Sequence, residues 1–75
     1  MKIKHLFTII IEKDEDGYFA YCPQLQGCYS QGENYEEALE NIKDAIRLHM
    51  DDRKEQKEPW KKTESINVTS LEMSL

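Results

Sequence analysis

The sequence has 75 residues, with 15 acidic and 10 basic side chains and a formal net charge of −5. A chain of this length accommodates one domain, which we place at residues 1–75 with no separate DNA-binding domain. The acidity argues against direct binding of nucleic acid, because contacts to phosphates need Lys and Arg gathered on one face. An apolar content of 39% is enough for a core and excludes wholesale disorder.

The compartment is predicted from what the chain lacks. No stretch approaches the roughly 20 apolar residues of a membrane span. The apolar run near the N-terminus is followed at once by Glu12 and has no small-residue cleavage site, so it is typical of a strand and not of a signal peptide. Two cysteines are too few for a disulfide scaffold. We therefore expect a soluble, cytoplasmic protein with no membrane partner.

The first third of the chain predicts a β-hairpin. Residues 3–12 are rich in β-branched and aromatic types, and their apolar side chains alternate. Residues 14–17 then supply turn formers, with Gly17 suited to a positive φ. A second strand is expected at residues 18–22, and it ends at Pro23, which cannot donate a ladder hydrogen bond.

A third strand is expected at residues 28–31, followed by a helix. Asn34 and Glu37 have the spacing of a capping box, so the helix begins at Tyr35 and ends before Pro59. Its apolar stripe comprises Tyr35, Ala38, Leu39, Ile42, Ala45, Ile46, His49 and Met50. A short final strand is expected at residues 66–69. The fold class is thus α+β: an antiparallel sheet of three to four strands with one helix on one face, in the order β-β-β-α-β.

Pairing of Lys13 with Tyr18 across the turn would assign the two faces of the sheet. Ile11 and Ala20 would then share one face with Ile9 and Cys22, and we expect the helix to cover it. The other face would hold Leu6, Ile10, Phe19 and Tyr21. One helix cannot cover both faces, so this second face is predicted to be an interface for self-association, for a different partner, or for both.

No group of side chains indicates catalysis. His5 lies on the first predicted strand and His49 on the helix stripe, and neither has a nearby nucleophile with a third orienting group. Cys22 and Cys28 are spaced too widely for a zinc knuckle and are read as buried thiols, with a disulfide as the alternative. The acidic residues 14–16 suit an exposed turn better than a metal site. We predict no enzyme activity, no metal and no cofactor.

Two segments resemble the HicB antitoxin family. Residues 17–28 contain a Gly-aromatic strand and a Pro-x-Leu-x-Gly-Cys turn, and residues 31–38 open the helix with Gly32, Glu37 and Ala38. Glu33 and Asn34 stand where that family usually has Asp and Thr. The resemblance covers about residues 5–50. It implies a partial ribonuclease-H-like fold and a role in neutralising HicA toxins, which are small basic ribonucleases that cut mRNA.

The resemblance and the acidity together lead to the functional prediction. We expect an antitoxin that binds and masks a HicA-type ribonuclease toxin, itself a homodimer or a higher oligomer, with no direct contact to nucleic acid. The predicted partner-binding residues are Ile10, Phe19, Tyr21, Glu36, Glu40 and Asp44. The alternative is a stand-alone oligomeric binding module without a cognate toxin. A nuclease-like enzyme is a third hypothesis, and it would need a metal-binding carboxylate cluster that Asp14 and Asp16 are poorly placed to form.

Overall fold

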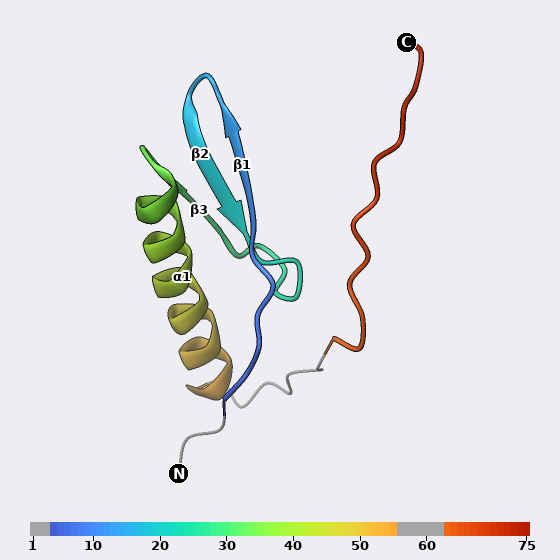
Figure 1. Ribbon diagram of the computed structural model, residues 1–75. Coiled ribbons are helices and arrows are strands. Elements are labelled where there is room, and N and C mark those ends of the chain that lie inside the picture. Colours follow the sequence, from blue (N-terminus) through green and yellow to red (C-terminus); the bar gives the residue numbers. More distant parts are fainter. Residues whose placement is uncertain (1–3, 56–62) are drawn as a thin grey trace.

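The computed structural model describes residues 4–55 and 63–75. Three strands, β1 (Ile10–Asp14), β2 (Gly17–Tyr21) and β3 (Tyr29–Gly32), precede one long helix, α1 (Tyr35–Glu55). The strands form an antiparallel sheet in the order β1-β2-β3. The helix lies across one face of this sheet (Figure 1). The α+β class and the β-β-β-α order are as predicted.

The hairpin has the predicted register. Lys13 pairs with Tyr18, and the ladder closes with Asp14 opposite Gly17, so the loop is only two residues long. Gly17 has a φ of 130°, which explains the glycine. The backbone N–H of Asp16 donates to the side chain of Asp14 at 2.8 Å, as turn-forming Asp residues commonly accept.

The ladder begins at Ile10, whereas the sequence predicted a strand from residue 3. The cause is β2, which ends at Tyr21 and leaves the preceding stretch of chain without a partner strand. The side chain of Gln24 replaces that strand. Its Oε1 accepts from the backbone N–H of Thr8 at 2.5 Å, and its Nε2 donates to the carbonyl of Leu6 at 3.1 Å. One amide side chain thus holds residues 6–8 extended in line with β1.

The helix begins with the predicted cap. The backbone N–H of Glu37 donates to Asn34 Oδ1 at 2.7 Å, and Glu37 Oε1 accepts from the backbone N–H of Glu33 at 3.1 Å. Gly32, two residues before the cap, lies directly against the first turn: a Cβ there would be 2.4 Å from the backbone nitrogen of Ala38. Only glycine permits β3 to approach the helix this closely.

The core lies between the sheet and the helix. Its buried members are Ala20, Cys22, Leu25, Cys28, Ala38 and Ile42, with Ile9 and Ile11 packed against them. The predicted assignment of the covered face is therefore confirmed. Both cysteines are free thiols, so the disulfide alternative does not apply. Tyr35 differs from its prediction, since it is exposed at the first position of α1 and adds nothing to this core.

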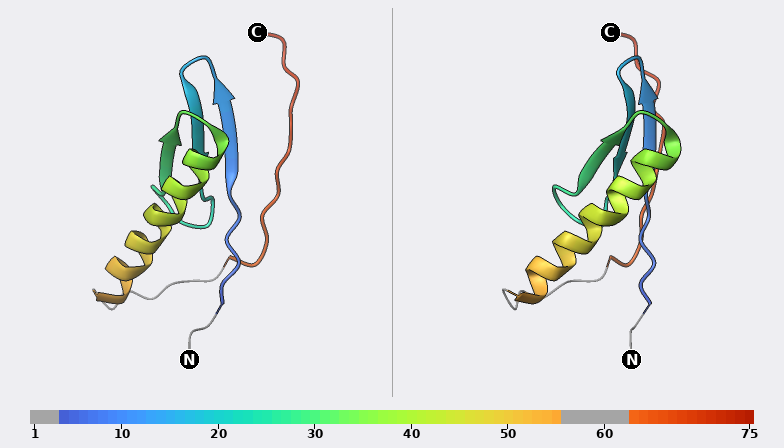
Figure 2. Two further views of the ribbon diagram at one scale, coloured as in Figure 1. Left: turned by 60° about the vertical axis from the view of Figure 1, so that its left-hand side comes forward. Right: turned by 90° about the vertical axis from the view of Figure 1, so that its left-hand side faces the viewer.

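The predicted final strand is wrong as an element of this sheet. Residues 63–75 are extended but belong to no strand. They stand apart from the sheet, on the side of β1 away from β2 (Figures 1 and 2). Most of their apolar side chains are exposed. Alternation at residues 66–69 predicts an extended backbone. A strand also needs a partner edge within hydrogen-bonding distance, and none of the described residues pairs with this segment in a sheet.

Candidate partner-binding surface

The sheet face opposite α1 carries a cluster of aromatic side chains. Phe19 and Tyr21 project from β2, and Tyr29 projects from β3. The Phe19 ring lies 5.7 Å from that of Tyr29 in a stacked arrangement and 6.1 Å from that of Tyr21. Ile10, opposite Tyr21 in the ladder, adds an aliphatic side chain from β1. We call these four residues the open face.

The open face is accessible and continues into a hollow. Tyr29 is 62% exposed, and the other three side chains are partly buried. A hollow of about 410 Å³ borders the three rings and is floored by the loop from Cys22 to Cys28. Aromatic side chains that are neither covered nor paired with a second layer are typical of a protein-binding surface.

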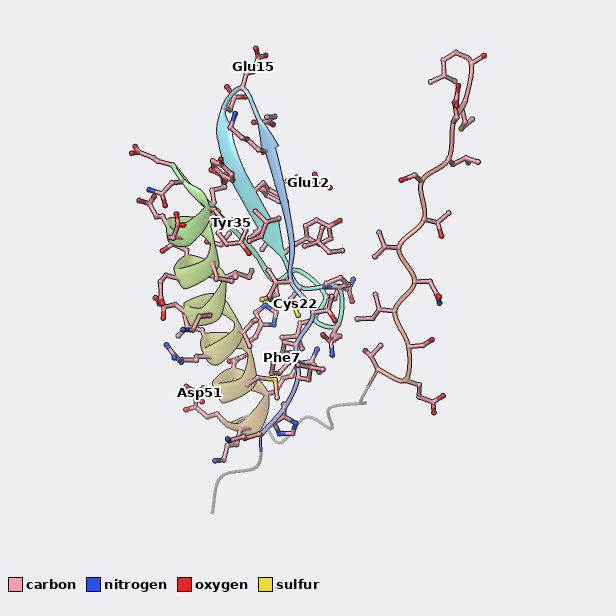
Figure 3. All side chains as sticks on the ribbon, viewed as in Figure 1. Phe7, Glu12, Glu15, Cys22, Tyr35 and Asp51 are labelled. Carbon is pink, nitrogen blue, oxygen red and sulfur yellow. The ribbon has the colours of Figure 1, made fainter. Side chains whose placement is uncertain are left out.

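Carboxylates surround one end of this surface. A second hollow of about 500 Å³ lies between the hairpin tip and the start of α1, next to Phe19. Its acidic lining residues, which we call the acidic rim, are Glu12, Asp14, Asp16, Glu33 and Glu37. Glu12 lies opposite Phe19 in the ladder and projects away from the helix (Figure 3). The single Lys in the lining, Lys13, lies 5.9 Å over the ring of Tyr18.

The three acidic residues predicted on the helix lie elsewhere. Glu36, Glu40 and Asp44, which we call the helix acids, follow one another at i, i+4 spacing on the side of α1 opposite its buried residues. Two of them are paired with basic neighbours: Glu40 with Lys43 at 3.3 Å and Asp44 with Arg47 at 3.1 Å. The sheet thus separates the helix acids from the open face.

The structure therefore brings together only half of the predicted set. Ile10, Phe19 and Tyr21 form one surface, and the helix acids form a second. Sequence reasoning missed Tyr29, whose place beside Phe19 depends on the register of β3 against β2. It also placed Glu12 at the end of the first predicted strand without assigning it to a face, although strand alternation already puts Glu12 on the same face as Ile10.

The two cysteines lie buried among apolar side chains. Burial raises the pKa of the Cys22 and Cys28 thiols, the opposite of what an activated nucleophile requires. Among residues 4–55 and 63–75, no group of three or more His, Cys, Asp or Glu side chains is arranged to hold a metal ion. No helix in the same ranges is long and apolar enough to cross a membrane.

The chain is similar to known proteins along most of its length. Residues 7–74 match the family model described as HicB-like antitoxin of bacterial toxin-antitoxin system. A UPF0150 protein of Helicobacter pylori is 62% identical over 47 residues, which are 63% of this chain and 65% of that protein. The match thus spans just under two thirds of that relative's length.

Two further relatives are covered more fully. A UPF0150 protein of Thermoplasma acidophilum is 46% identical over 65 residues, which are 83% of this chain and 94% of the relative. One of Synechocystis is 43% identical over 61 residues, which are 80% of this chain and 77% of the relative. No solved structure matches the chain significantly.

Proposed function

The chain belongs to the family of HicB-like antitoxins of bacterial toxin–antitoxin systems, and from this premise we propose that it binds and masks a HicA-type ribonuclease toxin that cleaves mRNA. Family membership supports a role in a toxin–antitoxin system in general. We choose the open face as the toxin-binding surface because it combines an aromatic cluster with carboxylates at its edge.

The aromatic cluster supplies the apolar centre of the proposed contact. Phe19, Tyr21 and Tyr29 are large side chains with few rotatable bonds, and such residues dominate the binding energy of protein interfaces. Because their rings already contact one another, little side-chain freedom is lost when a partner covers them. We propose that the toxin buries these rings together with Ile10.

The acidic rim accounts for the choice of a basic partner. A surface that binds RNA is positively charged because it contacts phosphates. The carboxylates at the edge of the open face are negatively charged, as phosphates are, and so attract the same surface. A toxin that binds the open face and places its basic side chains on the acidic rim could not use those side chains to bind RNA. In this proposal masking is competitive and requires no catalysis by the antitoxin.

The helix acids have a different role in the proposal. They lie on the far side of the sheet from the open face, so a small toxin bound there does not contact both. Exposed charges act over about one Debye length, roughly 8 Å at physiological salt, and raise the rate of encounter more than they stabilise the final complex. We therefore assign Glu36, Glu40 and Asp44 to steering.

Self-association completes the proposal. A domain of this size buries only about 60% of the surface that its unfolded chain exposes, so a second copy would add to its stability. We propose that the antitoxin is a homodimer or a higher oligomer that acts in the cytoplasm.

The test uses a purified HicA-type protein, which is a small basic ribonuclease. The two proteins are co-purified, and cleavage of an mRNA by the basic protein is followed with increasing amounts of the antitoxin. We expect a stable complex, complete inhibition near equimolar amounts, and no cleavage by the antitoxin alone. Absence of binding to any HicA-like protein would refute the toxin-masking role and favour the stand-alone module.

A further inference from the structure

We propose that the C-terminal segment of one copy, residues 65–73, adds as a fourth strand to the outer edge of β1 in a second copy. The inference rests on the second-copy part of the proposed function but not on the toxin. It assigns a role to residues 65–73, most of whose side chains are exposed in the single chain. It also names the surface through which two copies associate.

The donor is the extended segment. Residues 63–75 have a strand-like backbone and no place in the sheet. Val68 is 74% exposed and Leu71 is 80% exposed, and Met73 and Leu75 are exposed as well. The family match runs to residue 74, so this segment is part of the matched domain. These four apolar side chains, all beyond Ile66, have no covering partner among the described residues.

The acceptor is the edge of β1. This strand ends the sheet, and no strand of the described residues pairs with its outer side. In a strand, the N–H and C=O of one residue point to the same edge, and those of the next residue point to the opposite edge. The N–H of Thr8 points toward Gln24, on the β2 side. The N–H and C=O groups of Ile9, Ile11 and Lys13 therefore point to the outer edge of β1. Gln24 holds residues 6–8 in line with β1 and so lengthens this edge beyond the five paired residues.

The geometry argues for a second copy in place of the same chain. The start of the segment lies near its own N-terminal stretch, where Thr63 and Ile66 line a hollow with Leu6 and Thr8. Beyond that point the segment stands apart from β1 and belongs to no strand (Figures 1 and 2). Each copy therefore carries an unpaired donor segment and an unpaired strand edge at β1. In a two-fold dimer, the donor segment of each copy pairs with the β1 edge of the other copy. Both donor segments and both β1 edges are then paired, so the assembly closes at two copies.

Two exposed residues permit a clean test by sedimentation equilibrium. Val68→Asp combined with Leu71→Asp alters side chains that contribute little to the single chain, so folding by circular dichroism is expected to be unchanged. The wild-type chain is expected to sediment at twice its 8.9 kDa mass. The double variant is expected to dissociate, with a dimer constant weaker by at least about 100-fold. Leu48→Asp, at a 71% exposed residue of α1 outside the proposed contact, is the control and should remain dimeric.

Amide hydrogen exchange locates the contact. The N–H groups of Ile9 and Ile11 should be protected in the dimer and exchange rapidly in the Val68/Leu71 variant. A dimer in which both amides exchange rapidly would place the contact elsewhere and overturn the assignment to β1. If the wild-type chain is a monomer, the proposed strand pairing between two copies is overturned. Protection of the Ile9 and Ile11 amides in that monomer would show that the segment pairs with the β1 edge of its own chain. Neither result bears on toxin inhibition, which the cleavage assay measures separately.

Discussion

Gly32→Ala tests the close contact between the sheet and the start of the helix. An added Cβ would lie 2.4 Å from the backbone nitrogen of Ala38 and 2.9 Å from its Cα. Ordinary contacts to a Cβ begin near 3.4 Å, so β3 and α1 must separate by about 1 Å. Neither element is free to move, because Gly32 pairs with Tyr18 and the Ala38 N–H donates to the carbonyl of Asn34 at 3.0 Å.

The expected loss follows from these constraints. Overpacking commonly costs about 1–3 kcal/mol, and a clash between two backbone segments belongs at about 3 kcal/mol. That is roughly a 150-fold fall in the ratio of folded to unfolded protein. A 75-residue domain has a free energy of unfolding of about 4–11 kcal/mol, so the loss is a large fraction of it. The melting temperature should fall by about 12–24 °C, at about 4–8 °C per kcal/mol.

The assay is thermal and urea unfolding followed by circular dichroism. Gly27→Ala is the matched control, because nothing lies within 4 Å of its added Cβ. Its φ of 76° makes alanine cost about 1–2 kcal/mol through backbone strain alone. A Gly32→Ala variant within about 0.5 kcal/mol of the wild type, the scatter of neutral surface substitutions, would refute the close approach of β3 to the helix.

Three further predictions concern charge, the core and the thiols. Neutralising all three helix acids to Gln or Asn should slow association with the toxin and flatten its salt dependence while leaving the dissociation rate unchanged, as measured by stopped flow; a faster dissociation would show direct contact. Ile42→Ala should lower the free energy of unfolding by about 2–5 kcal/mol in urea titrations, because Ile42 is fully buried, and a smaller loss than that of Ile46→Ala would contradict the core assignment. Stability should decline above pH 9, because burial raises the pKa of Cys22 and Cys28 above the ordinary 9.0 and the unfolded state then releases protons first; a double Ser variant with the same decline would exclude the thiols as its cause.

Local sequence signals were sufficient for the hairpin and the helix. The turn at Gly17 and the cap formed by Asn34 and Glu37 act within a few residues, so the register and the start of α1 could be predicted without the fold. The covered face also followed, because alternation along β1 and β2 fixes which side chains share a face once Lys13 is opposite Tyr18.

The remaining features depend on contacts between distant residues. Gln24 takes over the pairing of the N-terminal stretch across 16 residues, and no local pattern marks it for that role. Tyr29 joins the open face only through the register of β3. The C-terminal segment has the alternation of a strand, but whether it pairs depends on an edge that the sequence does not locate. Composition reported the acidity of the helix correctly yet did not show that the sheet separates it from the aromatic cluster.

The central claim is that the open face masks the toxin, and one comparison tests it most directly. Inhibition of mRNA cleavage is titrated with three proteins: the wild-type chain, a Phe19→Ala/Tyr29→Ala variant, and a Leu48→Ala control that removes an exposed apolar side chain from α1. We expect the inhibition constant of the open-face variant to rise by about 30-fold or more, the loss of at least one interface hot spot of about 2 kcal/mol, while the control inhibits like the wild type. Undiminished inhibition by the folded open-face variant would contradict the account.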